Sequence, residues 1–296
     1  MAKVGFIGLG NMGLPMAKNL VAAGHAVAGF DLNADAVAGL VEAGGTAAAD
    51  PGAAVDGAEI VVTALPAARH VKGVYCGQGG ILDTAAKGTI FIDCSTIDVA
   101  SAREVIAEAE ERGQMMIDSP MSGGIGGATA GTLTFMVGGT DEAFAAAQPA
   151  LNAMGKNIFH AGGPGAGSAA KICNNMMLAI QMISVAEGFS LAKRLGLEPE
   201  KLYNISSTAT AKCWSLNDYC PVPGLAEKAA SNRGFEGGFA AELMLKDLRI
   251  AMEAAQGAGA PTPLGAHATQ IYAMMNLAGQ AGKDFSGVIE YLNGEG

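Results

Sequence analysis

The feature that most constrains the fold is "KVGFIGLGNMGLPMAKNL" (residues 3–20), where an apolar run meets three glycines and then a segment of helical spacing. In a strand–turn–helix unit the first glycine of G-x-G-x-x-G permits a tight turn, the second admits a pyrophosphate, and the third lets helix and strand pack closely. Free N–H groups at the helix start favour phosphate. The pattern therefore predicts a dinucleotide site at Gly8, Gly10, Asn11, Met12 and Gly13.

An acidic residue stands where that site requires one. Asp31 ends the second apolar run, 23 positions after Gly8, and "DLNADAV" contains no arginine that could bind a 2′-phosphate. A carboxylate there accepts hydrogen bonds from ribose hydroxyls and repels a 2′-phosphate, so NAD is favoured over NADP as the cofactor. The alternatives are a glycine-rich turn beside a surface aspartate, and a flavin, for which the sequence has no second signature.

The first part of the chain alternates short apolar runs with alanine-rich helical segments. Strands are predicted near residues 3–8, 26–31, 59–65, 89–95, 115–120, 132–139 and 157–162. Near-continuous apolar runs are typical of parallel strands buried on both faces. The fold class predicted is α/β, an N-terminal Rossmann-type doubly wound parallel sheet followed by an all-α C-terminal domain.

The pattern changes after Gly162, where "GGPGAGS" is a cluster of glycine and proline typical of a boundary. We therefore expect an NAD-binding domain at 1–162 and an all-α substrate and oligomerisation domain at 163–296. The second domain is predicted to begin with a long interdomain helix from about Ala169 to about Leu195. This helix is apolar nearly all round, so we expect it to be buried.

Composition excludes several classes of protein. Half of the 296 residues are hydrophobic and the net charge is -10, which argues against binding nucleic acid or an anionic membrane. The five cysteines and four histidines have no metal-ligand spacing, so no metal is expected. The longest apolar stretch is interrupted by Gln181 and Glu187, which argues against a membrane span. No basic segment of the kind that begins a signal peptide is expected before Lys3. We expect a cytoplasmic protein with free thiols.

Two polar residues in "GSAAKICNN" are candidates for catalysis. Lys171 and Asn175 are four residues apart, which places them on one face of the predicted long helix. Burial lowers the pKa of a lysine, and a lysine near neutrality can take a proton from an alcohol during oxidation. The alternative is a solvated lysine at a helix start, which is the commoner situation for lysine.

Other candidates follow the predicted strands. In "DSPMSGG", Ser122, Gly123 and Gly124 offer a hydroxyl and two unobstructed N–H groups, which suit a carboxylate; a flexible connection is an equal alternative. Ser95 and Thr96 stand at the end of one strand, and Leu65 and Pro66 come after another. Ligands of open parallel sheets lie beyond these carboxyl ends, although ordinary turns also occur there.

The second half contributes three further residues. Lys246 and Asp247 stand beside a hydrophobic stripe in "GGFAAELMLKDL", where the alternative is an ordinary surface pair. Trp214, the single tryptophan, lies in a turn-rich polar segment and can form a pocket wall or fill core.

Taken together, "FIGLGNMGLPMAKNL", "DSPMSGG", "GAGSAAKICNN" and "GGFAAELMLKDL" resemble the β-hydroxyacid dehydrogenases, in order and spacing and over essentially the whole chain. The resemblance implies NAD-dependent oxidation of a 3-hydroxy acid such as 3-hydroxyisobutyrate to its semialdehyde, without metal, by a homodimer or homotetramer. It implies that Lys171 transfers the proton with Asn175 as its partner. It also implies that Ser122, Gly123 and Gly124 hold the substrate carboxylate, that Thr96 and Lys246 line the cleft, and that Asp247 fixes the local geometry.

One departure from the family pattern stands in the carboxylate-binding motif. Ser119 and Met121 replace the usual alanine and valine, a change expected to alter pocket volume and not the chemistry. L-serine, tartronate semialdehyde and succinic semialdehyde remain alternative substrates. A module that senses NAD without turnover is the alternative from another class.

Overall fold

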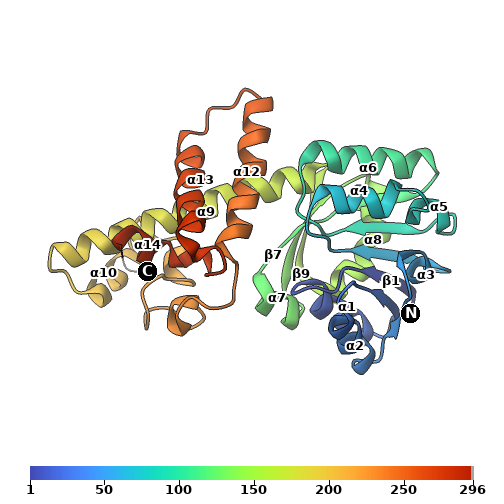
Figure 1. Ribbon diagram of the computed structural model, residues 1–296, viewed down its shortest axis with the longest axis horizontal. Helices are drawn as coiled ribbons and strands as arrows, with labels where there is room; N and C mark the ends of the chain where they lie inside the picture. Colours follow the sequence, from blue (N-terminus) through green and yellow to red (C-terminus); the bar gives the residue numbers. More distant parts are fainter. Residues whose placement is uncertain (295–296) are drawn as a thin grey trace. The chain divides into compact units, whose positions relative to one another are not determined.

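The computed structural model describes residues 1–294 and divides the chain into two compact units. The first unit is Met1–Lys171, and the second begins at Ile172. The domain boundary expected after Gly162 stays a prediction. The two units are described separately below, and Figure 1 shows the elements of each.

The first unit contains a sheet whose strand order within the described residues is β3-β2-β1-β4-β5-β6-β8-β7, with β9 paired to β8. The strands are β1 (Lys3–Ile7), β2 (Ala26–Phe30), β3 (Thr46–Ala47), β4 (Ile60–Thr63), β5 (Ile90–Asp93), β6 (Met115–Asp118), β7 (Met121–Ser122), β8 (Leu133–Gly138) and β9 (Gly155–Gly162). From β3 to β6 all pairs are parallel, which confirms the predicted parallel sheet. All the predicted strand regions contain a strand, whereas the two-residue strands β3 and β7 were not predicted.

The far edge of the sheet departs from the parallel pattern. Strand β8 pairs antiparallel with β6 and β7 and parallel with β9. The chain reverses direction over residues 123–132, a glycine-rich segment that includes one short helix, so β8 runs back antiparallel to β6 and β7. Before this reversal β7 continues along β8 past the end of β6, so Ser122 to Gly124 lie beyond the carboxyl end of β6.

Helices cover both faces of the sheet (Figure 1). They are α1 (Gly13–Ala22), α2 (Ala34–Glu42), α3 (Pro51–Val55), α4 (Ala68–Cys76), α5 (Ile81–Thr84), α6 (Val99–Glu111), α7 (Gly124–Ala130) and α8 (Asp141–Met154). Successive strand residues point to opposite faces, so Phe6 packs with α1, α2 and α8, whereas Ile7 packs with α3 to α6. This double burial is why the strands read as continuous apolar runs.

The second unit is helical. After α9 (Ala166–Arg194), which spans the division between the units, come α10 (Pro199–Ser206), α11 (Trp214–Asn217), η1 (Ala230–Arg233), α12 (Ala241–Gly257), α13 (Pro263–Met275), the π-helical turn η2 (Asn276–Gln280), η3 (Phe285–Gly287) and α14 (Val288–Asn293). Ala179, Met182, Ala186 and Phe189 of α9 recur at helical spacing and enter the core with residues of α11 to α14. The predicted all-α second half and its long first helix are both confirmed.

The expectation that α9 is buried all round is wrong. Met177 is 53% exposed and Leu191 59% exposed, because the other helices of the unit cover only part of its circumference. By length and composition alone, α9 is the one described helix that could span a membrane, and 39% of its most apolar stretch is buried. A helix that supplies one side of a protein core passes the same test, so this finding is weak evidence for a membrane.

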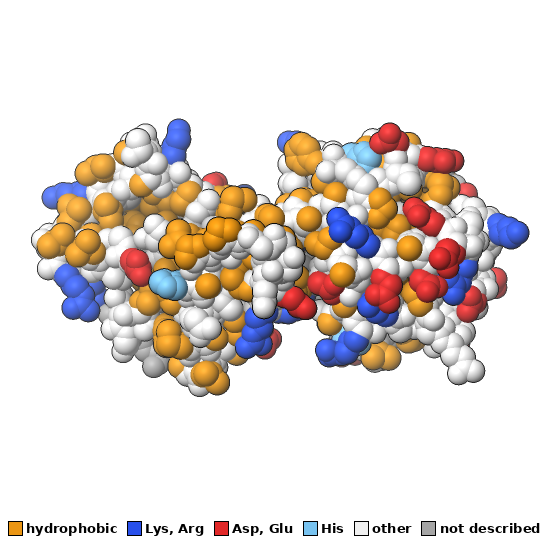
Figure 2. Space-filling view, turned by 90° about the horizontal axis from the view of Figure 1, so that it is seen from above, with side chains coloured by type: hydrophobic (Ala, Val, Ile, Leu, Met, Phe, Trp, Pro, Cys, Tyr) orange, Lys and Arg blue, Asp and Glu red, His pale blue; other side chains and the backbone are white. Residues whose placement is uncertain are grey.

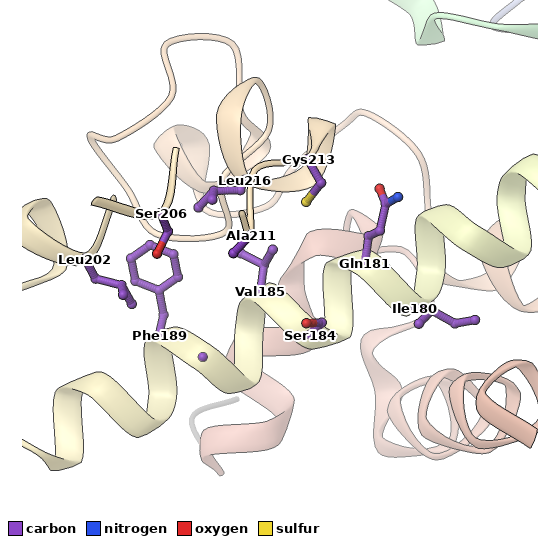
Figure 3. A pocket seen from close by; sticks show the side chains of 11 residues that line it. Ile180, Gln181, Ser184, Val185, Phe189, Leu202, Ser206, Ala211, Cys213 and Leu216 are labelled. Atoms are coloured by element: carbon purple, nitrogen blue, oxygen red, sulfur yellow. The ribbon is translucent and has the colours of Figure 1, made fainter. Parts of the chain in front are cut away.

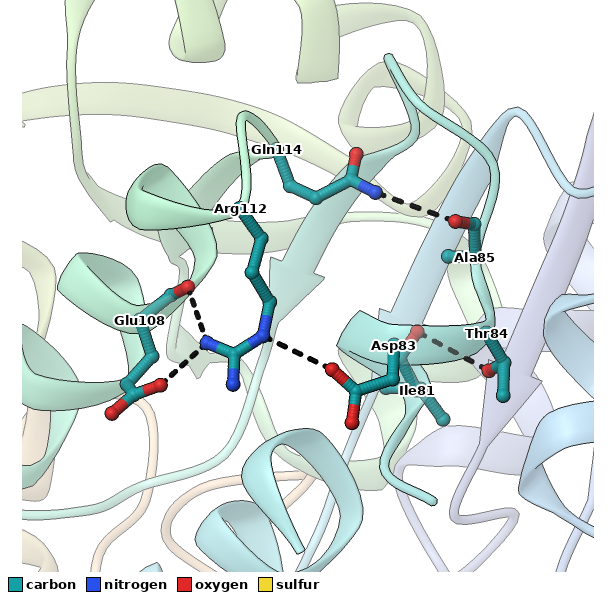
Figure 4. A network of polar contacts seen from close by, with 7 residues as sticks. All are labelled: Ile81, Asp83, Thr84, Ala85, Glu108, Arg112 and Gln114. Atoms are coloured by element: carbon teal, nitrogen blue, oxygen red, sulfur yellow. Dashed lines mark hydrogen bonds and ion pairs between the residues drawn. The ribbon is translucent and has the colours of Figure 1, made fainter. Parts of the chain in front are cut away.

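An ion network joins α5 and α6 on the surface of the first unit (Figure 4). Arg112 pairs with Asp83 at 3.2 Å and with Glu108 one turn back on its own helix. All three side chains are about one-third exposed or more, so solvent screens these charges and the network adds little to stability.

A second polar network is fully buried at the carboxyl ends of β4 and β5. Oδ1 of Asp93 accepts hydrogen bonds from the hydroxyls of Thr63 (2.7 Å) and Ser95 (2.6 Å). The Ser95 hydroxyl in turn accepts one from the N–H of Leu65 (2.8 Å). Burial raises the pKa of Asp93 to about 6, although hydrogen bonds from Ser95 and Thr63 oppose the shift. The network ties the loop after β4 to the loop after β5.

This burial predicts a pH-dependent effect of Asp93→Asn on stability. The native state holds the Asp93 proton more tightly than the unfolded chain, so this carboxyl stabilises the fold below about pH 4. That contribution is lost as pH rises through about 6. Asparagine keeps an acceptor for the hydroxyls and cannot ionise. The variant should gain about 1 to 2 kcal/mol of unfolding free energy relative to the parent between about pH 5 and about pH 8.

Urea unfolding at several pH values measures this difference. Asp50→Asn, which makes the same substitution at the exposed cap of α3, is the matched control and should not reproduce this gain. A stability difference between Asp93→Asn and the parent that does not vary with pH would contradict the interpretation.

Candidate active site

The three glycines of the first turn have different structural duties. Gly8 has a φ of +93°, and a Cβ there would lie 2.4 Å from the carbonyl oxygen of Ala64. A Cβ on Gly13 would lie 1.9 Å from the carbonyl oxygen of Gly8, so helix α1 can approach β1 only without a side chain. A Cβ on Gly10 would meet nothing within 4 Å. The fold therefore requires the first and third glycines, while the second leaves open space above the turn.

Asp31 bonds to the backbone of this turn and to the backbone of its own loop after β2. Its Oδ2 accepts a hydrogen bond from the N–H of Leu9 (2.6 Å), and its Oδ1 accepts one from Asn33 (2.7 Å). The sequence placed Asp31 near the glycine turn but did not indicate these bonds. Each carboxylate oxygen has a second lone pair, so the ribose contacts expected of Asp31 remain chemically available.

The loops that carry Leu65, Pro66 and Thr96 lie at the ends of the adjacent strands β4 and β5, which pair in register with Thr63 opposite Asp93. Leu65 and Thr96 are half-buried and Pro66 is exposed. The buried Asp93 and Ser95 bonds hold these loops together. Sequence reasoning noted Ser95 only as a strand-end residue and missed Asp93, whose signal was a carboxylate inside the apolar run "TIFIDCS".

The segment Ser122 to Gly124 forms an exposed turn between β7 and α7. Gly123 has a φ of +133° and Gly124 a φ of +61°, which side chains rarely adopt. Successive N–H groups in such a turn form a concavity that accepts an anion. The backbone of this turn is therefore compatible with a carboxylate site, which stays a prediction.

Lys171 is not a solvated surface lysine. The residue is 8% exposed, and its Nζ donates a hydrogen bond of 2.7 Å to the carbonyl oxygen of Met121, directly before Ser122. The structure therefore brings Lys171 beside the start of the Ser122–Gly124 turn. The surface alternative considered from the sequence is wrong for this residue.

An aspartate missed by the sequence analysis holds the same two segments together. Asp118 ends β6, and its carboxylate accepts hydrogen bonds from the N–H groups of Gly165 (2.8 Å) and Ser168 (2.6 Å) at the start of α9. Burial raises the pKa of Asp118, and both backbone bonds act in the opposite direction. The signal in the sequence was its place as the first residue of "DSPMSGG".

The second unit holds Asn175, Lys246 and Asp247 in one polar group. The side-chain amide of Asn175 donates to Oδ2 of Asp247 (2.6 Å), and Nζ of Lys246 lies 3.6 Å from Oδ1 of the same carboxylate. Asn175 and Asp247 are 2% and 3% exposed, so their orientation is fixed. Lys171 precedes Asn175 by about one turn of α9. The predicted roles of these residues stay predictions.

Trp214 begins helix α11 and is 47% exposed. Its ring stacks on Tyr219 with centroids 4.8 Å apart, and Tyr219 stacks on Phe285. The hydroxyl of Tyr219 donates to the buried carboxylate of Asp284 (3.0 Å). Sequence reasoning missed this support, because Asp284 and Phe285 lie about 65 residues after Tyr219 in the chain.

A groove of about 340 Å³ lies elsewhere in the second unit, along α9 (Figure 3). Its walls are mainly apolar and include Ile180, Val185, Phe189 and Leu202. Among the described residues, its lining includes none of the predicted site residues. Residues 1–294 also contain no group of His, Cys, Asp and Glu that could hold a metal ion.

Comparisons with known proteins cover both halves of the chain. Residues 3–163 match the model of the NAD-binding domain of 6-phosphogluconate dehydrogenase. Residues 165–292 match the model described as NAD-binding of NADP-dependent 3-hydroxyisobutyrate dehydrogenase.

Individual relatives are similar over nearly their full lengths. A probable mitochondrial 3-hydroxyisobutyrate dehydrogenase of Dictyostelium discoideum is 47% identical, over 98% of this chain and 90% of its own length. An NAD-dependent L-serine dehydrogenase of Pseudomonas aeruginosa is 49% identical, over 97% of this chain and 96% of its own length. The solved structure of Mycobacterium tuberculosis 3-hydroxyisobutyrate dehydrogenase with L-serine superposes with a TM-score of 0.93 at 46% identity and covers 99% of both chains.

Because these matches extend over both units, and the first unit holds the glycine turn and the buried lysine, the chain belongs to the β-hydroxyacid dehydrogenase family.

Proposed function

We propose that this chain is an NAD-dependent dehydrogenase that oxidises 3-hydroxyisobutyrate to methylmalonate semialdehyde, a step of valine breakdown. The observation that carries the proposal is the buried Lys171, whose Nζ is fixed on the carbonyl of Met121 beside Ser122. Relatives named for this activity, 45–47% identical to the chain, support the choice of substrate.

The first unit fits a dinucleotide at the glycine turn. The open space at Gly10 admits a pyrophosphate, and the carboxylate of Asp31 stands at the end of β2 for the ribose. Leu65, Pro66, Thr96 and Lys246 are the further residues proposed to hold the cofactor. When bound, NAD supplies a hydride acceptor for the hydroxymethyl carbon of the substrate.

Each residue proposed to act on the substrate has one task. The hydroxyl of Ser122 and the N–H groups of Gly123 and Gly124 bind the carboxylate, which orients the alcohol. As the hydroxymethyl carbon loses its hydride, Lys171 accepts the hydroxyl proton, and it returns a proton in the reverse reduction. Asn175, whose amide is oriented by Asp247, holds the reacting oxygen in place.

L-serine is a second candidate substrate. It is favoured by the 49% identical L-serine dehydrogenase and by the similar Mycobacterium enzyme, whose structure was solved with L-serine. L-serine and 3-hydroxyisobutyrate share a carboxylate and a hydroxymethyl group and differ by an ammonium or a methyl group on the carbon between them. The proposed carboxylate turn and proton acceptor serve both. Tartronate semialdehyde and succinic semialdehyde stay less supported alternatives.

We further propose that the protein is a homodimer or homotetramer assembled through the second unit. Figure 2 shows hydrophobic side chains gathered on the surface of this unit. Its exposed large hydrophobic residues include Met177, Leu191, Ile205, Leu264, Met274 and Leu277. Exposed apolar surface of this kind is typical of protein interfaces. The apolar groove along α9 lies on the same unit.

A substrate panel tests the proposed reaction. With NAD, reduced-nicotinamide absorbance should rise fastest with 3-hydroxyisobutyrate, and L-serine should give a measurable slower rate, because a group of methyl size changes selectivity by only about 1 to 3 kcal/mol.

Lys171→Ala should lower kcat by roughly a hundredfold or more with cofactor binding preserved. Lys201→Ala, at an exposed lysine of α10, should match the parent. Normal turnover by Lys171→Ala would refute the assignment of this residue.

Cofactor choice is tested by the charge beside the ribose. Asp31→Ala combined with Leu32→Arg, at a side chain that is 95% exposed, should raise kcat/KM with NADP relative to NAD by about tenfold or more, because a repelling charge becomes an attracting one. Affinity for both cofactors should fall, since Asp31 also holds the N–H of Leu9. Leu32→Arg alone is the control and should shift the ratio less. An unchanged ratio in the double variant would show that Asp31 does not select the cofactor.

Light scattering after size exclusion tests the assembly. The parent should have the mass of two or four chains at micromolar concentration. Leu191→Glu should shift it towards the monomer, because a charge cannot be buried in an apolar contact without a partner. Phe159→Glu, at a residue of the first unit that is 61% exposed, is the matched control and should leave the mass unchanged. A monomeric parent would overturn the proposal.

A further inference from the structure

Asp118 and Lys171 form two cross-links between the same pair of segments. The carboxylate of Asp118 bonds to the N–H groups of Gly165 and Ser168, and Nζ of Lys171 bonds to the carbonyl of Met121. Asp118 precedes Met121 by three residues, and Ser168 precedes Lys171 by three residues. One segment carries the proposed carboxylate turn, and the other carries the proposed proton acceptor.

From this pairing we infer that Asp118 is a positioning residue for Lys171, which sets the amine against the Ser122–Gly124 turn. The inference rests on the proposed role of Lys171 and goes beyond it, because it assigns a task to a residue that touches neither substrate nor cofactor. It predicts that catalysis depends on the bonds that the Asp118 carboxylate makes to the start of α9.

The sheet fixes one end of this tether. Asp118 is paired with Asp93 of β5 on one side and with Gly138 of β8 on the other, so neighbouring strands hold its backbone on both sides. The residue is 2% exposed. A carboxylate fixed in this way can position whatever segment bonds to it.

The start of α9 supplies the other end. The first N–H groups of an α-helix lack partners within the helix, and the helix dipole favours a negative charge beside them. Asp118 satisfies two such groups, one on each carboxylate oxygen, although they lie 47 and 50 residues further along the chain. Bonds at two points restrict both the rotation and the translation of the first turn.

Two glycines make room for the carboxylate. A Cβ on Gly138 would lie 2.4 Å from Oδ1 of Asp118, and one on Gly167 would lie 3.0 Å from Oδ2 and 2.2 Å from the carbonyl oxygen of Met136. The helix start therefore packs directly on the strand ends. Small displacements cannot be absorbed by flexible side chains here.

The geometry carries this restriction to Lys171. From Ser168 to Lys171 the helix rises only about 4.5 Å, so an error at the tether reaches the amine almost undiminished. A misplacement of about 1 Å in a catalytic group can lower the rate about a hundredfold. Loss of the tether should therefore reduce turnover without removing any group that reacts.

Asp118→Asn tests the inference, because the amide offers one acceptor in place of two and turns an N–H group towards the helix start. We expect kcat with the preferred hydroxy acid to fall about 10- to 100-fold, with the Kd of NADH changed by less than about twofold. Asp118→Ser, which keeps a helix-capping oxygen, is the second variant if Asp118→Asn fails to fold. Asp50→Asn, at the exposed cap of α3, is the matched control and should leave kcat unchanged.

A double-mutant cycle separates positioning from general stability. If Asp118 acts through Lys171, adding Asp118→Asn to Lys171→Ala should lower the residual kcat by less than about threefold. Multiplying losses, an unchanged kcat in the Asp118 variants, or a loss confined to the Kd of NADH would each overturn the inference. Normal turnover by Lys171→Ala would instead refute the proposed role of the lysine, so the two failures are distinguishable.

Discussion

The site in the first unit depends on one constraint, which is that parallel strands buried on both faces end at a common edge. Strands β1, β2, β4, β5 and β6 pair with one another along their lengths, so the chain can vary only beyond the strand ends. The glycine turn, Asp31 and the loops after β4 and β5 all lie at that edge. The same edge holds Asp93 and Asp118 side by side, at paired positions of β5 and β6.

Most of the fold was readable from local sequence. Continuous apolar runs marked the parallel strands, and the change at "GGPGAGS" preceded the confirmed helical half. What escaped prediction depended on contacts between distant segments. The bonds of Asp118 to residues 165 and 168 have no local pattern, and the buried network of Asp93 looked like an ordinary strand end. The exposed side of α9 was missed because apolar composition does not reveal what covers a helix.

The predicted site residues divide in an informative way. The tight glycine turn and the burial of Lys171 could be predicted because each motif carries its own physical signal, namely close backbone approach and an amine beside apolar neighbours. The resemblance alone implied a role for Asp247, which bonds to Asn175 in the fold. The support of Trp214 could not be identified, because Asp284 and Phe285 reach Tyr219 only in the folded unit. Sequence motifs therefore indicate the groups proposed to react, while the residues that orient these groups emerge from packing. This difference explains why the positioning role of Asp118 is a structural inference.

The choice between 3-hydroxyisobutyrate and L-serine depends on the group bound to the carbon between the carboxylate and the hydroxymethyl group. A methyl group requires only apolar contact, whereas an ammonium of similar size must be hydrated or paired, because burying an uncompensated charge is costly. Strong discrimination therefore requires a specific acceptor for the ammonium, and without one the proposed carboxylate turn and proton acceptor would suit both substrates equally.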